Sequence, residues 1–241
     1  MDLSVYYALL FLIIAVSLFV VMWLLTKKSS SDRYNQSSIQ LLGEKDYQVE
    51  WVYTVSDKHS SFAVISSGTQ DTKASRNISV FAGEAVKNAY LDYFHKSAST
   101  ENFFKTAIDK ANKTIADNVL EQNIRPDITA MLIKDGFLHV ADIRDTLQGG
   151  AVYIYKNGAL REIKNKKRIS KLFITKVRLD GSEVVLMASK HAVSSLDERD
   201  ILLCLRGNFE PIQKCEQLCD IILNKRLKEQ GNVTIVVAYN Q

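Results

Sequence analysis

Four short polar segments border apolar, β-rich runs in this chain of 241 residues. They are Ser66-Ser67-Gly68, Asp142-Ile143-Arg144-Asp145-Thr146, Ser189-Lys190-His191 and Gly231-Asn232-Val233-Thr234. The carboxylates of Asp142 and Asp145 could accept backbone N–H bonds at a strand end, or contribute to a cation site. Two carboxylates are too few for a two-metal centre. Lys190 could bind a phosphate group through its charge.

The three cysteines and four histidines form no recognisable metal motif. Cys204, Cys215 and Cys219 lie in apolar-patterned stretches, where buried free thiols are expected. Cys215 and Cys219 are one helical turn apart, but no fourth ligand accompanies them, so we do not expect a zinc site. The histidines are scattered, and only His191 stands beside a candidate binding residue, Lys190.

The segments between these motifs predict hairpin-linked strands and paired helices. The expected strands are 49–55, 62–66, 129–133, 137–142, 151–155, 160–163, 172–179, 184–188 and 233–239, and the expected helices are 79–94, 103–120, 196–205 and 212–230. Asp135-Gly136, Asn157-Gly158 and Asp180-Gly181 are hairpin turn signals. Strands joined by hairpins, with helices arriving in pairs, indicate an α+β layered sandwich rather than a parallel doubly wound sheet.

In order and context these segments resemble a protein phosphatase 2C (PPM-type) domain over Tyr47 to Tyr239. Family members carry Asp-Gly where this chain has Ser66-Ser67-Gly68, and Ser-Asp-Gly where it has Ser189-Lys190-His191. Their motif Val-Ala-Asn-x-Gly-Asp-Ser-Arg is matched in part by 140–146. They close with Asp-Asn-x-Thr and an apolar strand, which Gly231-Asn232-Val233-Thr234 matches except at its first residue. The resemblance implies a PPM-type α-β-β-α sandwich.

The departures from the family pattern all affect one function. In active members the carboxylates of these segments hold two divalent cations, which activate a water molecule and bind the phosphate. The corresponding positions here are Ser66 with Ser67, Lys190 and Gly231, none of which supplies a carboxylate. An early Arg-x-x-Asn-x-Asp segment, which would bind phosphate, is not found either. The resemblance therefore implies a degenerate site with neither metal ligands nor catalytic residues.

The expected function is that of a pseudophosphatase, an inactive domain that binds, scaffolds or regulates a protein partner without a cofactor. Lys190 and His191 are the candidates for binding phosphate or a phosphorylated partner that is not cleaved. Asp145, Asn232 and Thr234 are expected to be structural remnants of the phosphatase site. A purely structural subunit of a membrane complex is an equally simple reading of the same residues.

An active metal-dependent serine/threonine phosphatase with divergent ligands is the enzymatic alternative. It would hold Mg²⁺ or Mn²⁺ through carboxylates outside the matched positions. The candidates are Asp57, Asp71, Asp142 and Asp145.

The first residues predict a membrane anchor, because 3–25 contain no charged side chain. A helix of that length spans about 34 Å, enough for a hydrocarbon core of roughly 30 Å. A cleaved signal peptide, the alternative, would begin with basic residues, whereas this chain has Asp2 there. Lys27, Lys28 and Arg33 follow the apolar run, so we expect the N-terminus outside and the C-terminal domain in the cytoplasm.

The expected organisation is a transmembrane helix at 3–25, a flexible linker at 26–45 and a phosphatase-like domain at 46–241. The linker is expected because its residues are mainly Ser, Lys, Gln and Asn without an apolar period. The net charge of +4 is small, and the basic run 164–171 has few aromatic neighbours, which argues against nucleic acid. That run is either a solvated loop or a contact with anionic lipid. The expected partners are the bilayer and a protein, phosphorylated or part of a membrane complex.

Overall fold

The computed structural model describes residues 34–41, 50–68, 72–94, 99–118, 126–143, 150–163, 172–225 and 232–240, all within the unit Tyr34–Gln241. The predicted span 3–25 lies outside them, and so do Asp71, Asp145, Gly231 and the basic run 164–171. Among the described residues no helix is both long and apolar enough to cross a bilayer.

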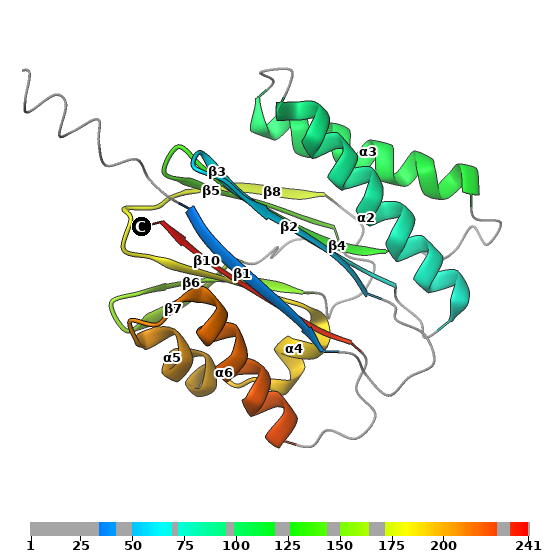
Figure 1. The fold of residues 1–241 in the computed structure, drawn as a ribbon. Helices are drawn as coiled ribbons and strands as arrows, with labels where there is room; N and C mark the ends of the chain where they lie inside the picture. Colours follow the sequence, from blue (N-terminus) through cyan, green and yellow to red (C-terminus); the bar gives the residue numbers. More distant parts are fainter. Residues whose placement is uncertain are drawn as a thin grey trace, which may run out of the picture. The chain divides into compact units, whose positions relative to one another are not determined.

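Ten strands of the described chain form two antiparallel sheets of five (Figure 1). Sheet A has the order β1-β10-β9-β6-β7, and sheet B has the order β2-β3-β4-β5-β8. The strands are β1 Tyr34–Leu41, β2 Glu50–Ser56, β3 Ser60–Ser67, β4 Asp127–Lys134, β5 Phe137–Ile143, β6 Ala151–Lys156, β7 Ala159–Ile163, β8 Phe173–Arg178, β9 Val184–Ala188 and β10 Val233–Asn240.

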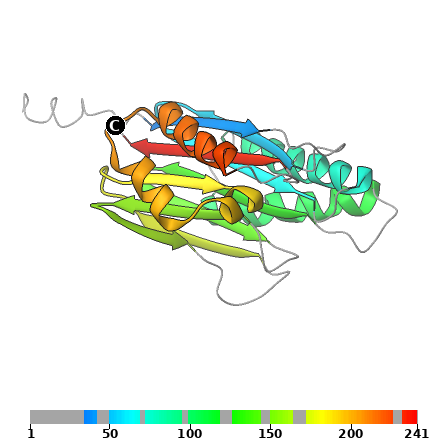
Figure 2. The same cartoon turned by 90° about the horizontal axis from the view of Figure 1, so that it is seen from below.

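Helices cover the outer face of each sheet (Figures 1 and 2). The pair on sheet B is α2 (Lys73–Phe94) and α3 (Thr100–Asn118). Sheet A carries α4 (Lys190–Ser195), α5 (Glu198–Arg206) and α6 (Pro211–Asn224). The predicted α+β class and its α-β-β-α layering are therefore confirmed.

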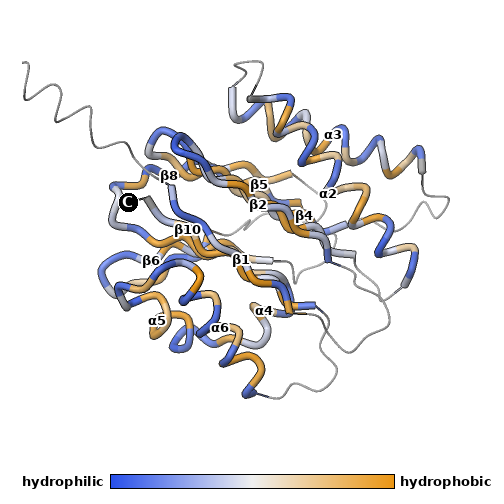
Figure 3. Tube along the Cα trace, in the orientation of Figure 1, coloured by the Kyte–Doolittle hydropathy of each residue, from blue (hydrophilic) through white to orange (hydrophobic). Residues whose placement is uncertain are grey.

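Three apolar clusters fill the spaces between these layers. Long hydrophobic stretches of the trace lie in the central strands, whereas β1 is largely hydrophilic, as Figure 3 shows. The central cluster lies between the sheets and includes Ile65, Met131, Val140, Met187 and Val236, all 2% exposed or less. The two outer clusters join each sheet to its helices. Because both faces of both sheets are buried, most central strands are nearly continuous apolar runs.

The prediction of a flexible linker up to residue 45 is wrong for β1, which pairs with β10 from Tyr34↔Asn240 to Leu41↔Val233. The strand lacks an apolar pattern because polar side chains point toward sheet B. Gln36 Nε2 donates to the Phe62 carbonyl at 3.2 Å, and Ser38 shares a hydrogen bond with Thr54 at 3.3 Å. These bonds replace the apolar contacts that sequence reasoning looks for.

The helices differ from their predicted bounds at several ends. The first predicted helix, 79–94, begins six residues earlier at Lys73, and the third, 196–205, does not begin at Leu196. Leu196 is instead the C-cap of α4, a short helix that was not predicted. Asp197 then caps α5 in a capping box with Asp200, which fixes the start of that helix.

The strands bring two sets of residues to opposite ends of the sandwich. At the turn end, Asp135-Gly136 and Asn157-Gly158 form the predicted hairpin turns, with positive φ at all four residues. Tyr34 starts β1 there, because its hydroxyl accepts a hydrogen bond from the Gly136 N–H at 3.2 Å. At the other end, which we call the polar end, β3, β5 and β9 finish and β2, β4 and β10 begin.

Candidate functional site

The polar end holds a cluster of buried polar residues. They lie at the ends of strands from both sheets and are all 6% exposed or less. This polar cluster consists of Glu50, Ser66, Asp127, Thr129, Asp142, Ser189, Asn232 and Thr234. Since burying polar groups costs free energy unless they are hydrogen-bonded, such a concentration at one end is the first candidate for a site.

Glu50 connects the two sheets within the polar cluster. It begins β2 in sheet B, paired with Ser67, and its Oε2 accepts a hydrogen bond of 2.8 Å from the Thr234 hydroxyl of β10 in sheet A. Burial disfavours the charged carboxylate and raises the pKa of Glu50 to about 7, while hydrogen bonds with Thr234 and Ser189 act in the opposite direction.

Ser189 and Thr234 hold the ends of β9 and β10 together. The Thr234 N–H donates to Ser189 Oγ at 3.1 Å, and the Ser189 N–H donates to the Thr234 carbonyl at 2.9 Å. Thr234 therefore uses its backbone on Ser189 and its hydroxyl on Glu50.

Asp142 of β5 is also hydrogen-bonded to a hydroxyl on a neighbouring strand, β4. Its Oδ1 accepts a hydrogen bond of 3.1 Å from Thr129, the residue that faces it across β4 and β5. Gly150 packs closely here, since a Cβ at that position would lie 2.9 Å from the Ala188 carbonyl oxygen and 3.2 Å from Thr129 Oγ1.

The matched positions Ser66, Ser67 and Lys190 lie at this end. Ser66 is fully buried, and the described residues offer its hydroxyl no hydrogen-bond partner. Ser67 is half-buried at the end of β3, and Lys190 is the half-buried first residue of α4. His191 follows Lys190 in α4, and Asn232 is buried immediately before β10. The fold thus brings the predicted strand ends together, apart from Gly231 and Asp145 outside the described residues.

Close packing against α2 explains why residue 68, just after the end of β3, is a glycine. A Cβ on Gly68 would lie 2.6 Å from both Cβ and the carbonyl oxygen of Ser75 in α2. The end of β3 therefore approaches the first turns of α2 at backbone distance, which only glycine allows.

The described donors do not fit a pair of divalent cations. Within the described chain no three His, Cys, Asp or Glu side chains come close enough together to hold a metal ion. Glu50 Oε2 and Asp142 Oδ1 accept hydrogen bonds from protein hydroxyls, the buried Glu50 Oε1 has no hydrogen-bond partner among the described residues, and Ser66 and Lys190 supply no negative charge. A two-metal site needs several carboxylates directed at shared ions.

Of the four carboxylates of the enzymatic alternative, the described residues include Asp57 and Asp142, and these two lie at opposite ends of the sandwich. Asp57 lies in the turn between β2 and β3, where its Oδ1 accepts bonds of 2.7 and 2.8 Å from the His59 and Ser60 N–H groups. Ser60 pairs with Lys134 at the turn end, whereas Asp142 lies at the polar end. Asp57 and Asp142 therefore cannot share a metal.

Sequence reasoning missed Glu50. The only local signal is one acidic residue at the start of the apolar run Trp51 to Val55. Its partner Thr234 is 184 positions away, so their contact depends on the packing of the two sheets.

Sequence reasoning also missed Lys214, which is 2% exposed. Its ammonium donates to the carbonyls of Cys204, Leu205 and Gly207, and so binds the C-terminal end of α5. Burial lowers the pKa of Lys214.

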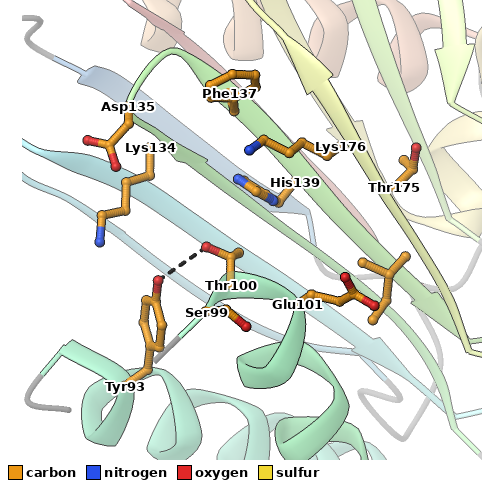
Figure 4. Close-up of a pocket in the computed structure, with 11 residues that line it drawn as sticks. Tyr93, Ser99, Thr100, Glu101, Lys134, Asp135, Phe137, His139, Thr175 and Lys176 are labelled. Carbon is orange, nitrogen blue, oxygen red and sulfur yellow. Dashed lines mark hydrogen bonds between the residues drawn. The ribbon is translucent and has the colours of Figure 1, made fainter. Parts of the chain in front are cut away.

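A separate cavity of about 570 Å³ lies toward the turn end, between the start of α3 and strands β5 and β8 (Figure 4). Lys176 and His139 face each other across β5 and β8. Burial lowers the pKa of His139 to about 4, and the nearby charges of Lys176 and Lys134 contribute, while Asp135 opposes them. Lys176 Nζ also lies 3.8 Å from the centre of the Phe137 ring. At neutral pH His139 is therefore uncharged.

No family model matches this sequence, and none of the curated proteins matches it closely enough to count as a relative. Solved structures do match the fold. The serine/threonine phosphatase PstP of Mycobacterium tuberculosis is 16% identical with a TM-score of 0.70, over 86% of this chain and 98% of that one. The serine/threonine phosphatase of S. agalactiae is 12% identical with a TM-score of 0.70, over 86% of this chain and 100% of that one.

The PP2C phosphatase domain of SpoIIE from Bacillus subtilis is 13% identical with a TM-score of 0.66, over 87% of this chain and 64% of that structure, which includes part of a regulatory domain. A further structure of PstP contains two manganese ions. The chain thus has the fold of PP2C-type serine/threonine phosphatases, as the resemblance predicted.

Proposed function

We propose that this domain is a membrane-anchored pseudophosphatase that binds a protein partner and does not hydrolyse phosphate esters. The proposal is based on the hydrogen bonds between threonine hydroxyls and carboxylates in the polar cluster. Glu50 Oε2 and Asp142 Oδ1 accept hydrogen bonds from Thr234 and Thr129, and the Ser66 side chain carries no charge. A protein hydroxyl thus binds one oxygen of each of these carboxylates, whereas the carboxylates of a hydrolase of this class bind metal ions.

Lys190 adds a positive charge where the resemblance implies a metal ligand. A lysine there repels a dication, since like charges about 4 Å apart at an effective dielectric of about 20 cost about 4 kcal/mol per unit pair. The same charge favours a phosphate group on a partner. Lys190 and the adjacent His191 are therefore the proposed contact for a phosphorylated segment.

The anchor belongs to the same proposal. Residues 3–25 span the bilayer, and Lys27, Lys28 and Arg33 hold the following domain on the cytoplasmic side. The partner is accordingly a cytoplasmic protein or the cytoplasmic part of a membrane complex.

The test is turnover of p-nitrophenyl phosphate and of a phosphoserine peptide by the full chain with Mn²⁺ or Mg²⁺. We expect no turnover above that of buffer with metal. Turnover that is lost in Asp145→Asn and retained in the surface variant Lys113→Met would contradict the proposal. Asp145 is the informative choice because the resemblance places it near the phosphatase site.

Binding is tested separately by calorimetry with the phosphoserine peptide and its unphosphorylated form. The phosphorylated form should bind more tightly, and Lys190→Met should remove the difference. Equal affinities for the two peptides would exclude Lys190 as a phosphate contact. If the domain binds neither peptide and shows no turnover, the result favours the other hypothesis, a purely structural subunit of a membrane complex.

A further inference from the structure

The start of the domain is bound to the start of α6 at the turn end. Asn35 Nδ2 donates to Glu210 Oε2 at 2.9 Å, and the Tyr239 hydroxyl donates to the same oxygen at 3.1 Å. Glu210 is the N-cap of α6, where its side chain also takes part in a capping box. The point at which the chain enters the domain is thus fixed beside the α5–α6 connection.

Exposed apolar side chains gather around this connection. Of the described residues, the large hydrophobic side chains that are strongly exposed are Leu91, Leu203, Phe209, Ile212 and Leu223. Three of them, Leu203 at 61%, Phe209 at 44% and Ile212 at 41%, lie within ten positions of the chain around Glu210. Together with Arg206 these residues of α5, α6 and their connection are called the α5–α6 corner.

A groove continues the corner toward the β6–β7 turn. It has a volume of about 460 Å³, and its walls include Tyr155, Leu202, Leu203, Arg199 and Arg206. Neither arginine has an ion pair with a described carboxylate. The surface therefore combines apolar side chains with two arginines that no described carboxylate pairs with, and an apolar and anionic partner would complement it.

The short connection between the proposed membrane span and Tyr34 favours the bilayer as this partner. Only the eight residues 26–33 separate the proposed span from Tyr34. Fully extended, they reach at most about 28 Å. Lys27, Lys28 and Arg33 in this stretch favour the anionic headgroup region. If residues 3–25 are the anchor of the proposed function, this connection limits the distance between the bilayer and Tyr34 to about 28 Å.

We propose that the α5–α6 corner rests on the anionic surface of the bilayer, with Leu203, Phe209 and Ile212 entering the headgroup region and Arg199 and Arg206 contacting lipid phosphate. This inference depends on the membrane anchor of the proposed function. It is independent of whether the domain hydrolyses phosphate.

Contact of the α5–α6 corner with the bilayer would direct the polar end away from the membrane. Strand β1 runs from Tyr34 at the turn end to Leu41, which pairs with Val233 at the polar end. Eight residues of strand extend about 26 Å. The polar cluster and Lys190 therefore face the cytoplasm, where a soluble phosphoprotein can reach them.

The test uses the full chain in vesicles of equimolar phosphatidylcholine and phosphatidylserine. A cysteine introduced by Asn208→Cys carries an environment-sensitive NBD label beside Phe209, and Lys113→Cys carries the same label on α3 as the solvent control. The native thiols do not compete, because Cys204, Cys215 and Cys219 are buried and burial raises the pKa of each. Lipids with a nitroxide on the acyl chain quench labels at the membrane surface.

We expect strong quenching and a blue shift at position 208 and neither effect at position 113. Leu203→Ser with Phe209→Ser should abolish the quenching at 208, whereas Leu91→Ser, with 43% exposure on α2, should leave it unchanged. Arg199→Gln with Arg206→Gln should reduce it, and so should replacing phosphatidylserine by phosphatidylcholine. The arginine pair provides a second test if the serine pair reduces folding.

The possible failures are distinguishable. If the chain floats with the vesicles and resists carbonate extraction but position 208 is not quenched, the docking is wrong and the anchor stands. If carbonate releases the chain, the anchor is wrong and the docking fails with it. Quenching that persists in the serine and arginine pairs would overturn the assignment to the α5–α6 corner and leave this end free for a protein partner.

Discussion

Glu50 and Thr234 meet between the two sheets through a hydrogen bond of 2.8 Å, although 184 positions separate them in the chain. The bond lies inside the polar cluster, at the end of the sandwich where the strands that carry Ser66, Ser189 and Thr234 meet. A carboxylate at such an end could serve a metal, but this one is bound to a protein hydroxyl. Its burial, which raises the pKa of Glu50 to about 7, makes its protonation depend on the folded state.

Glu50 should make stability fall as the pH rises from about 4.5 to 7. The pKa of Glu50 is higher in the folded than in the unfolded protein, so the folded state binds more protons in this interval. The whole effect is about 3 kcal/mol, from the relation of about 1.4 kcal/mol per pKa unit. Glu50→Gln removes the titration, and urea unfolding at pH 5 and pH 8 should show a smaller difference in the variant. Glu216→Gln, exposed on α6, is the control.

Lys214 should be important for the stability of the α5–α6 pair. Its ammonium bonds to three carbonyls at the end of α5, and Lys214→Met leaves these buried groups without a partner. We expect a loss of about 2 kcal/mol in the free energy of unfolding, the usual cost of buried polar groups left unbonded. Lys113→Met on exposed α3 should change it by less than about 0.5 kcal/mol. Equal effects in the two variants would show that the contact with α5 contributes nothing.

Gly83 should resist substitution although it lies inside α2. Ala is the better helix former by about 1 kcal/mol, but a Cβ at Gly83 would overlap the Trp51 ring at Cε3. Gly83→Ala should therefore destabilise the domain by about 1–3 kcal/mol through overpacking. Trp51→Leu makes room, so the double variant should lose less than the sum of the two single variants. Additive losses in urea unfolding would mean that the ring does not meet residue 83.

His139 should respond to the charge of Lys176. The pKa of His139 is lowered to about 4 by burial and by the lysines, so its contribution to stability is present above about 6.5 and is lost as the pH falls through 4. Lys176→Met removes one cause and should raise the pKa of His139. Proton NMR of the imidazole as a function of pH measures this. Lys113→Met should leave the titration unchanged, and an unchanged titration in Lys176→Met as well would refute the coupling.

Much of the fold follows from local patterns. Val, Ile and Phe runs around Asp135-Gly136 and Asn157-Gly158 predict the hairpins, because positive φ at the turn residues is a property of the turn itself. β1 could not be predicted in this way, since Gln36 and Ser38 face inward and their partners in sheet B are known only once the sheets are packed.

The site also contains some residues that local patterns predict and others that depend on tertiary packing. The strand ends at Ser66, Ser189 and Thr234 are recognisable by motif order and do lie at one end of the sandwich. Glu50 carries no motif, and its contact with Thr234 is a product of tertiary packing alone. A buried lysine such as Lys214 is equally hidden, because its partners are backbone carbonyls that any residue could provide.

The most direct measurement is a calorimetric titration of the full chain with Mn²⁺ near neutral pH, alongside the variant Ser66→Asp with Lys190→Asp and Gly231→Asp. The native chain should show no saturable binding, because Glu50 and Asp142 are bound to hydroxyls and Lys190 is positive. The triple variant restores carboxylates at all three matched positions and should bind Mn²⁺ more tightly. Saturable binding of two ions by the native chain, weakened by Asp145→Asn, would contradict the account.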